Sequence, residues 1–323
     1  MQNKTAEIVE QIRTVIVGKD EIILKTLMAI LSGGHILLED VPGTGKTTLA
    51  LAVAKTLGLQ FKRVQFTSDS MPSDITGFSV YDKNGGAFDY KPGAAMTNLL
   101  LADEINRTSS KTQSALLEVM EENQITVDGV THPVPQPFIV IATQNPVGSA
   151  GTQLLPQAQL DRFMVRLSMG YPDFESEVSI LTDRHTSNPL DNLHPIVSAQ
   201  ELIAMKQEAN EIYIADAIYS YVTQLARATR QHPMITLGLS PRGSLGVCRM
   251  AKAYAYLAGR NYVLPEDVAA VFTDVSCHRI ILSPKARLAQ MTADAVLKDV
   301  LDSVAMPVAT KKSKTKSGKG HRE

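Results

Sequence analysis

The chain has 323 residues, of which 44% are hydrophobic and 20% are charged. This composition excludes disordered and fibrous proteins, and the length allows two domains because one hydrophobic core rarely grows past about 250 to 300 residues. No apolar run approaches the roughly 18 residues of a membrane span, and the first residues lack the apolar region of a signal peptide. We therefore expect a cytoplasmic protein without a membrane span.

Charge separates the end of the chain from the rest. The formal net charge is −1, and the last thirteen residues hold six basic residues and one acid, a charge of +5 that leaves −6 for the body. An acidic body offers no broad basic surface. We therefore expect no nucleic acid among the partners.

Residues 1–185 are predicted to form an α/β domain. Four short apolar runs indicate buried strands, and they alternate with helical stretches, which is typical of a parallel sheet covered on both faces. The strands are HILLED (35–40), FKRVQF (61–66), NLLLADE (98–104) and FIVIAT (138–143), and the helical stretches are 46–58 and 109–124.

Two inserts interrupt this plan, near residues 78–93 and 125–132. Turn residues stand between alternating stretches in both, at 84–86 (NGG) and at 128–129 (DG). Such residues accept the positive φ of tight turns, so both inserts are predicted to be hairpins that project from the edge or end of the sheet. The sequence leaves open whether they carry function or are ordinary surface hairpins.

Residues 186–305 are predicted to form a second, helical domain. Ser198 and Glu201 have the spacing of a capping box at the start of one helix, and proline stands in the first turn of two more, at SPRGSLG and LPEDVAA. Residues 306–323 are predicted to be a disordered basic tail, because they are rich in Lys, Ser and Gly after Ala309. We expect this tail to be solvated; a weak tether to an anionic partner is the alternative.

The stretch LLEDVPGTGKTTLA (37–50) is typical of a phosphate-binding loop. Backbone N–H groups at a helix start bind phosphate there, and glycines let the backbone approach the ligand. Lys46 can reach the β and γ phosphates, and Thr47 can offer its hydroxyl to Mg²⁺. Asp40 replaces the first glycine of G-x-x-x-x-G-K-[ST], and Asp tolerates a left-handed conformation. A turn that binds no ligand is the alternative. We assign to nucleotide binding Pro42, Gly43, Thr44, Gly45, Lys46, Thr47 and Thr48.

An acidic pair, Asp103-Glu104, ends the third predicted strand, where open α/β sheets place ligand chemistry. Asp103 can bind the nucleotide's Mg²⁺ together with Thr47, and Glu104 can orient and deprotonate an attacking water. Loop and acids together predict hydrolysis of ATP or GTP. The guanine-reading pattern Asn-Lys-x-Asp does not occur in the sequence, so we predict ATP.

Eight segments together resemble the MoxR family of AAA+ ATPases, and the similarity runs to about residue 305. It implies an ATP hydrolase with an α/β AAA+ P-loop core, whose parallel sheet is flanked by helices, plus a smaller C-terminal all-helical lid domain. The family accepts Asp at the position of Asp40. The segments are VIVGKDEI (15–22), LLEDVPGTGKTT (37–48), RVQFTSDSMPSDITGF (63–78), LLLADEINR (99–107), KTQSALLEVMEENQITVDG (111–129), IATQNP (141–146), LPQAQLDRF (155–163) and GLSPRG (238–243).

The resemblance also implies catalytic roles that spacing cannot supply. Asn145 resembles the sensor-1 residue, which helps to position the attacking water beside Glu104. Arg162 resembles the arginine finger that enters the neighbouring subunit's site and stabilises charge as the phosphoryl group departs. A surface salt bridge is the alternative for Arg162, and Arg166 is its nearest competitor. Arg242 resembles sensor 2, which couples the lid to the phosphates; the alternative is a helix-start arginine paired with an acid.

Weaker similarities concern the adenine pocket and the subunit interface. Val17 and Gly18 resemble the stretch that lines the adenine pocket, although an apolar residue before a glycine turn is more often packing alone. Gln157 stands where the family pattern has glutamate, which removes the carboxylate for an acidic contact across the interface, and Arg107 also resembles an interface residue. The two predicted hairpins resemble, in chain order, the helix-2 insert and the pre-sensor-1 hairpin, which face the pore or a bound partner.

For the function, the resemblance implies a ring-forming ATPase, a homo-hexamer that remodels or matures a client protein complex. MoxR relatives work with partners that carry a von Willebrand factor A domain and assist assembly or metal-cofactor insertion. One alternative is a AAA+ ATPase that acts on nucleic acid as a loader or helicase, which the acidic body opposes. Another is a small-molecule kinase, which Arg162, Arg242 and the helical domain oppose.

Overall fold

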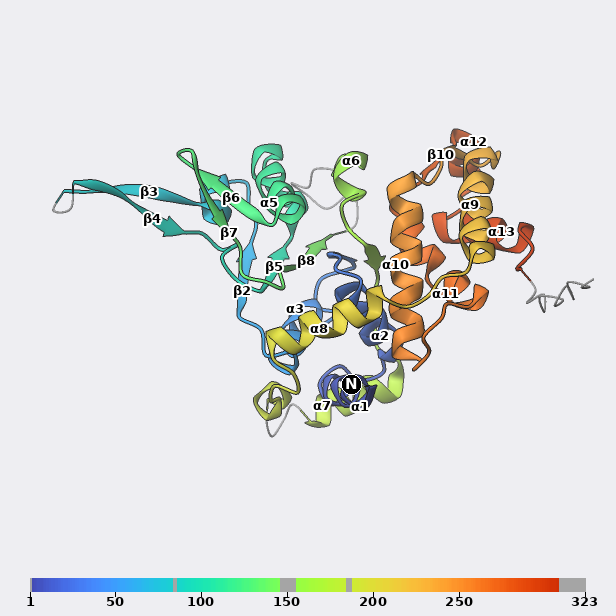
Figure 1. The fold of residues 1–323 in the computed structure, drawn as a ribbon, viewed down its shortest axis with the longest axis horizontal. Helices are drawn as coiled ribbons and strands as arrows, with labels where there is room; N and C mark the ends of the chain where they lie inside the picture. Colours follow the sequence, from blue (N-terminus) through green and yellow to red (C-terminus); the bar gives the residue numbers. More distant parts are fainter. Residues whose placement is uncertain (1, 84–85, 146–154, 184–187, 308–323) are drawn as a thin grey trace, which may run out of the picture.

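The structure is a computed structural model that describes residues 2–83, 86–145, 155–183 and 188–307. A central sheet lies between helices, a long hairpin extends from one side, and a group of helices lies on the other side (Figure 1). The elements before the lid are α1 (Gln2–Arg13), α2 (Asp20–Leu31), β1 (Ile36–Glu39), α3 (Lys46–Thr56), β2 (Phe61–Gln65), α4 (Pro72–Thr76), β3 (Gly77–Asp82), β4 (Ala87–Pro92), β5 (Leu99–Asp103), η1 (Ile105–Arg107), α5 (Ser110–Glu122), β6 (Gln124–Val127), β7 (Val130–Pro133), β8 (Ile139–Gln144), α6 (Gln157–Leu160), β9 (Val165–Leu167), α7 (Phe174–Asp183) and η2 (Pro189–Asn192).

The central sheet has five parallel strands in the order β2-β5-β8-β1-β9. Its first four strands are those predicted from the apolar runs. The fifth, β9, was not predicted, because three residues are too few to show a strand pattern. One expectation was wrong in detail: β2 was predicted to be a buried strand, but it lies at the sheet edge, and Lys62, Arg63 and Gln65 are exposed. Within the predicted strand 61–66, only Phe66, which follows β2, is fully buried.

Alternate residues of the inner strands enter two different hydrophobic clusters. Leu100 and Val140 belong to the cluster that contains Leu116 and Leu117 of α5. Leu101 and the other strand residues whose side chains point to the opposite face belong to a larger cluster. This cluster includes residues of α1, α2 and α3 and continues into the lid helices. This alternation is what a parallel sheet covered on both faces requires, because side chains along a strand point to opposite faces.

Both predicted hairpins are confirmed in the described residues. β3 pairs antiparallel with β4, and β6 pairs antiparallel with β7. Asp128 and Gly129 have positive φ angles of 50° and 78° at the second turn, while 84–85 of the first turn lie outside the described residues. The ring of Tyr90 on β4 stacks on His132 of β7, with centroids 3.9 Å apart. The two hairpins are thus joined at their bases, and β3–β4 extends away from the body (Figure 1).

The C-terminal part is a lid of helices, as predicted, with one addition. A short two-stranded sheet joins β10 to β11, so the lid is not entirely helical. The capping box of Ser198 and Glu201 begins α8, and Ser240 caps α10 with Pro241 in its first turn. The lid elements are α8 (Ala199–Asn210), α9 (Asp216–Gln231), β10 (Ile235–Leu237), α10 (Pro241–Leu257), α11 (Pro265–Ser276), β11 (Ile281–Leu282), α12 (Pro284–Leu288) and α13 (Ala293–Ser303).

The predicted domain boundary between 185 and 186 lies outside the described residues, as does the predicted tail from 308 onward. These boundaries stay predictions. Among the described residues, each helix is too short or too polar to cross a lipid bilayer.

Candidate nucleotide site

The predicted phosphate loop connects the end of β1 to the start of α3, which begins at Lys46. Gly43 and Gly45 have φ angles of 86° and 92°, values that residues with a Cβ rarely adopt. Gly45 is the N-cap of α3, so the backbone N–H groups of the loop lie at the positive end of a helix dipole. The loop therefore has the local geometry of an anion site.

Asp40 supports this loop in a way that the sequence did not reveal. It is absent from the positive-φ residues of the described chain, so tolerance of a left-handed conformation is the wrong reason for its presence. Instead its buried carboxylate accepts hydrogen bonds from the N–H of Gly170 (2.6 Å) and the hydroxyl of Ser168 (3.2 Å). Asp40 thus fastens the start of the loop to the segment that follows β9.

The side chain of Lys46 is held over the loop by backbone carbonyl groups of the loop itself. Its Nζ donates to the carbonyl oxygens of Asp40 (2.6 Å) and Val41 (3.1 Å). Burial lowers the pKa of Lys46, while the nearby carboxylates of Asp40, Asp103 and Glu104 act in the opposite direction. The ammonium group therefore lies where the loop and the acids converge.

One cavity of about 350 Å³, here called the phosphate cavity, brings most of the predicted nucleotide residues together. The predicted Thr44 lines a neighbouring cavity instead. Two lining residues, Arg63 and Gln65, were missed because charged and polar residues on an edge strand resemble ordinary surface. The cavity is lined by Pro42, Gly43, Gly45, Lys46, Thr47, Thr48, Arg63, Gln65, Asp103, Glu104 and Asn145.

Asp103 is anchored at the end of β5 by two partners. The Thr143 hydroxyl donates to its Oδ1 at 2.6 Å, and the guanidinium of Arg63 donates to its Oδ2 at 2.6 Å. The same Thr143 oxygen accepts the backbone N–H of Glu104 at 2.8 Å. Thr143, on the adjacent strand β8, thereby fixes both acids relative to each other.

Glu104 has a backbone conformation that few residues with side chains adopt, with φ 58° and ψ 45°. Its Oε2 accepts from Arg107 at 2.8 Å and its Oε1 accepts from Asn145 at 3.2 Å. The bond from Arg107 is the main cause that lowers the pKa of Glu104, and the bond from Asn145 acts in the same direction. The carboxylate is therefore ionised at neutral pH, as a general base must be.

Asn145 is in turn held by a residue that the sequence did not single out. The buried Asn106 donates from Nδ2 to the Asn145 carbonyl at 3.2 Å and accepts the Asn145 N–H at 3.4 Å. Asn145 thus lies beside Glu104, and its role in positioning water stays a prediction. Pro146, the last residue of the motif IATQNP, lies outside the described residues.

The donor groups in this cavity fit Mg²⁺ and a nucleotide. A hydroxyl from Thr47 and a carboxylate from Asp103 are the oxygen ligands that Mg²⁺ prefers, and both line the same cavity as Lys46. Thr47 and Asp103 would hold the cation, although Asp103 is paired with Arg63 here. Arg63 is partly exposed and long enough to turn away from the cavity.

A second cavity, of about 300 Å³, borders the loop at Gly43, Thr44 and Gly45. Val17 lines it and Gly18 does not, and the role of both in an adenine pocket stays a prediction. An added Cβ on Gly18 would lie 2.2 Å from the Ser176 hydroxyl, so this glycine permits close packing against α7. The sequence missed the other apolar walls of this cavity, among them Ile16, Met169, Tyr171, Ile180 and Leu181.

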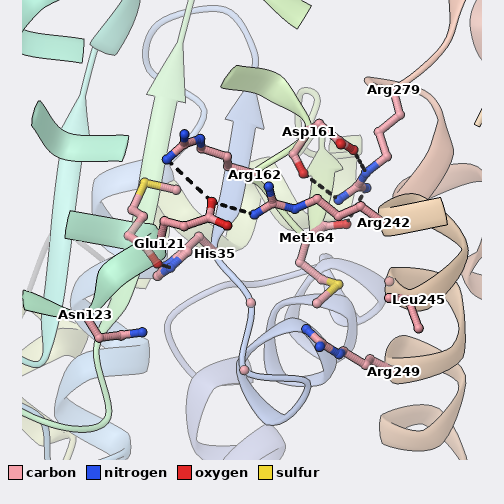
Figure 2. A pocket seen from close by; sticks show the side chains of 14 residues that line it. His35, Glu121, Asn123, Asp161, Arg162, Met164, Arg242, Leu245, Arg249 and Arg279 are labelled. Atoms are coloured by element: carbon pink, nitrogen blue, oxygen red, sulfur yellow. Dashed lines mark hydrogen bonds and ion pairs between the residues drawn. The ribbon is translucent and has the colours of Figure 1, made fainter. Parts of the chain in front are cut away.

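Arg162 and Arg242 lie together in a third cavity, of about 460 Å³, here called the arginine cavity. Both guanidinium groups point toward Glu121 of α5 (Figure 2). Glu121 Oε2 lies 2.8 Å from Arg242 Nη2 and 3.5 Å from Arg162 Nη1, and Arg242 is the main cause that lowers the pKa of Glu121. Among the described residues, none lines both this cavity and the phosphate cavity. Arg249 of α10 also lines it and was missed from the sequence.

The remaining predicted residues have contacts within the chain. Arg166, the competitor of Arg162, lies 3.7 Å from Glu39. Gln157 donates from Nε2 to the carbonyl oxygen of His278 at 2.8 Å, so it connects the core to the lid. Arg107, for which an interface position was predicted, pairs with Glu104 of its own chain.

Known proteins share both parts of this fold. The ATPase family associated with various cellular activities (AAA) matches residues 35–165, and the AAA lid domain matches residues 227–300. YeaC of Bacillus subtilis is 47% identical and covers 93% of this chain and 94% of its own length. Chaperone MoxR1 of Mycobacterium tuberculosis is 39% identical and covers 92% of this chain and 81% of its own.

The three-dimensional comparison agrees with the sequence comparison. The crystal structure of a proposed ATPase from Cytophaga hutchinsonii has a TM-score of 0.88 and 39% identity, and it covers 95% of this chain and 96% of that one. This similarity extends over nearly the full length of both chains. The chain therefore belongs to the MoxR family of AAA+ ATPases.

Proposed function

We propose that this chain hydrolyses ATP at interfaces between copies of itself in a ring of six. The observation that carries the proposal is the division of the predicted catalytic residues between two cavities. The phosphate cavity holds the loop and the acids, whereas Arg162 and Arg242 lie together in a cavity that shares none of its described lining residues. A second copy that presents its arginine cavity to the first copy's phosphate cavity would complete the site.

Within one copy, each residue of the phosphate cavity has a distinct task. The loop N–H groups and Lys46 bind the phosphates, and Glu104 removes a proton from the attacking water. Asn145, which already contacts the Glu104 carboxylate, orients that water. Mg²⁺, held by Thr47 and Asp103, would neutralise charge on the phosphate oxygens.

The neighbouring copy contributes Arg162 and Arg242. Two guanidinium groups beside the departing phosphoryl group stabilise its charge. Glu121, together with the Leu117 carbonyl that accepts from Arg162 Nη1 at 2.6 Å, keeps both groups in the same region before the neighbour's phosphates reach them. Because Glu121 is partly exposed, this pairing is weak enough to be replaced by phosphate.

The energy of hydrolysis serves, in our proposal, to remodel or mature a client protein complex, including insertion of a metal cofactor. A relative that is 39% identical is named a chaperone, which supports this class. The hairpin β3–β4 offers a contact surface, since Phe78 and Phe88 expose 53% and 73% of their surface. A protein with a von Willebrand factor A domain is the partner that we expect, and the cytoplasmic location stays a prediction from the sequence.

Mixed rings test the division between the two cavities. Arg162→Ala subunits keep the loop, and Lys46→Ala subunits keep the arginines, so each variant alone should retain only a small residual activity. In a random equal mixture about a quarter of the interfaces would combine an intact loop with intact arginines. We expect ATPase activity to reappear on mixing, measured as phosphate release, while an Arg162→Ala and Arg242→Ala mixture stays inactive.

The assignment in trans is wrong if mixed rings form, as shown by co-purification of differently tagged subunits, and phosphate release does not recover. The same assay addresses the nucleic-acid alternative. Because the body of the chain is acidic, duplex and single-stranded DNA should leave phosphate release unchanged at physiological salt. Stimulation that disappears as salt rises would favour that alternative instead.

A further inference from the structure

A buried arginine of the lid, Arg279, contacts the core segment that carries Arg162. Its side chain is only 3% exposed, and its Nε donates to Asp161 Oδ1 at 2.7 Å. Its Nη groups donate to the carbonyl oxygens of Phe163 and of Met164, the latter at 3.0 Å. Nη2 also donates to the carbonyl oxygen of Asp161 at 3.2 Å, so Arg279 holds the backbone on both sides of Arg162.

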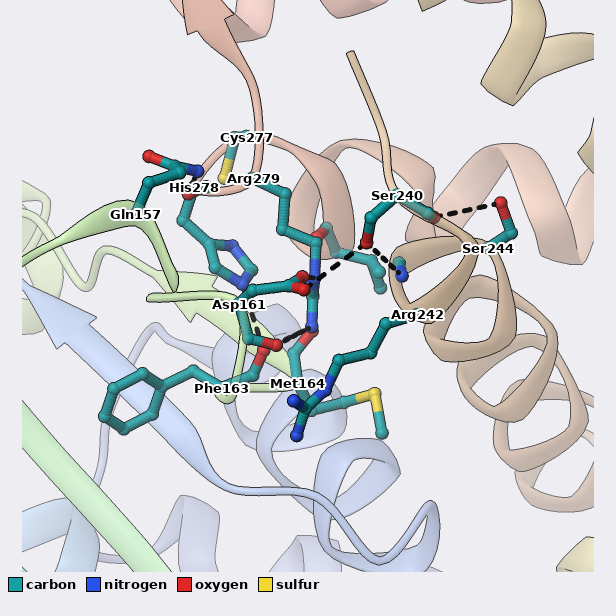
Figure 3. A network of polar contacts seen from close by, with 12 residues as sticks. Gln157, Asp161, Phe163, Met164, Ser240, Arg242, Ser244, Cys277, His278 and Arg279 are labelled. Atoms are coloured by element: carbon teal, nitrogen blue, oxygen red, sulfur yellow. Dashed lines mark hydrogen bonds and ion pairs between the residues drawn. The ribbon is translucent and has the colours of Figure 1, made fainter. Parts of the chain in front are cut away.

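The same carboxylate also contacts the helix that carries Arg242. Asp161 Oδ2 accepts from the hydroxyl of Ser240 at 3.3 Å, and this hydroxyl accepts the N–H of Gly243 as the N-cap of α10. Arg242 is therefore two residues from a side chain that is bonded to Asp161. In Figure 3 the Asp161 carboxylate lies close to both Arg279 and Ser240.

A second lid residue, His278, also contacts this segment. The Nε2 of His278 lies 3.0 Å from the Phe163 carbonyl oxygen, and Gln157 donates to the His278 carbonyl. Burial lowers the pKa of His278 well below its usual range, so the ring is neutral and Nε2 donates. The lid thus contacts this short segment at several neighbouring points.

We propose that Asp161 and Arg279 are positioning residues, whose ion pair joins the lid to the Arg162 segment and presents Arg162 and Arg242 to the neighbouring subunit as one rigid unit. This inference rests on the proposed function. A long arginine side chain loses rotamer entropy when it is held in one position, so two such side chains from different domains need a common anchor. A displacement of about 1 Å at a reacting centre can cost about 100-fold in rate.

If this pair had a purely structural role, a folded variant that replaces both partners would keep wild-type kcat. Replacing a buried ion pair by apolar or neutral groups of similar size is often neutral for stability, whereas removing one partner leaves an uncompensated buried charge and is strongly destabilising. The informative variant is therefore the pair Asp161→Asn with Arg279→Met, which leaves no uncompensated charge. A second variant, Arg279→Lys, keeps the charge but loses the planar fork that reaches several acceptors at once.

A matched control comes from another ion pair between core and lid. Lys25 of α2 lies 2.7 Å from Asp274 of α11, and both side chains are largely buried. In the hydrogen bonds of the described residues, neither contacts 161–164. The control variant is Lys25→Met with Asp274→Asn, which removes a core–lid pair of the same kind without touching the Arg162 segment.

The experiment compares full-length variants that form rings, by steady-state ATPase kinetics and nucleotide binding. We expect the Asp161/Arg279 variant to lose at least about tenfold in kcat while its affinity for nucleotide stays unchanged, because its own phosphate cavity is intact. Arg279→Lys should lose part of this activity, and the Lys25/Asp274 control should keep wild-type kcat. Mixing the Asp161/Arg279 variant with Lys46→Ala subunits should restore activity.

A second measurement separates positioning from general damage. If the pair acts only through the two arginines, then adding Asp161→Asn and Arg279→Met to an Arg162→Ala Arg242→Ala subunit should lower kcat no further. A further drop in that background overturns the proposal, as does wild-type kcat in a folded, ring-forming pair variant. If that variant does not fold, wild-type kcat of Arg279→Lys overturns it equally. Failure of the Arg162→Ala and Lys46→Ala mixture would instead refute the proposed function.

Discussion

The phosphate cavity and the arginine cavity are built in opposite ways. Residues of the phosphate cavity lie on or just after β2, β5, β8 and β1, which are successive neighbours in one parallel sheet, so their carboxyl ends meet at one edge. The arginine cavity takes residues from α5, from the segment before β9, and from α10 and the end of α11 in the lid. A movement of the lid would therefore change the second cavity and leave the first intact.

The largest expected effect breaks the phosphate cavity alone. Glu104→Gln removes the general base, which contributes about 100-fold to 10,000-fold in rate, so phosphate release should fall by at least about 100-fold. Binding of ATP should persist, because the loop and Lys46 are unchanged. Single-turnover hydrolysis and equilibrium binding with a fluorescent nucleotide measure the two quantities.

Subunit mixing tests whether Glu104 and Lys46 act on the same nucleotide. Glu104 and Lys46 belong to the same cavity, so Glu104→Gln and Lys46→Ala subunits should not restore each other. Glu118→Gln is the matched control, since Glu118 is exposed on α5 and lines neither cavity. Recovery of activity in the first mixture would mean that Glu104 acts on a neighbour's nucleotide, and the two cavities would not divide the site as described.

A smaller effect concerns the support of the phosphate cavity. Asp40→Gly restores the strict loop pattern but removes the hydrogen bonds from Gly170 and Ser168. We expect the free energy of unfolding to fall by about 1 to 3 kcal/mol, because hydrogen bonds to a buried charged group are lost. Urea denaturation measures this, and Asp40→Asn, which keeps an acceptor oxygen, should lose less. An Asp40→Gly variant as stable as the wild type would show that these bonds do not hold the loop.

The smallest effect is a shift in pH dependence. Arg107 is the main cause that lowers the pKa of Glu104, and a carboxylate with a lowered pKa keeps its charge to lower pH. Activity that needs this charge is present above the pKa and is lost as pH falls through it. Arg107→Gln should therefore move the acid limb of kcat/KM to higher pH, while Arg227→Gln on the exposed face of α9 should leave it in place. An unmoved limb in the Arg107 variant would remove Glu104 from the role of base.

Local patterns were sufficient for much of the fold. Four of the five central strands, both hairpins and the capped lid helices follow from apolar runs, turn residues and capping boxes. These signals are local, because each depends on residues a few positions apart. β9 was not predicted because a segment of three residues is too short to show a periodic pattern. The exposure of β2 was not predicted because the order of strands in the sheet decides which strand lies at its edge.

The site shows the same division. Lys46, Asp103 and Glu104 were found because they stand next to one another in the loop or at the end of a strand. Arg63 was missed, since its contact with Asp103 spans 40 residues and depends on the pairing of β2 with β5. Glu121 was missed for the same reason: an exposed acid on a helix has no sequence signal until two arginines lie beside it.

The loop, the acidic pair and the family resemblance could be read from the order of the residues, because phosphate binding and strand ends use neighbours in the chain. The hydrogen bonds that Asp40 accepts could not be predicted, since its partners follow β9 in the chain. The link between Arg162 and Arg242 could not be predicted either. That link runs through Asp161 and Arg279, which are 118 positions apart and meet only when the lid packs on the core. Packing between domains depends on the shapes of whole surfaces, which no short pattern records.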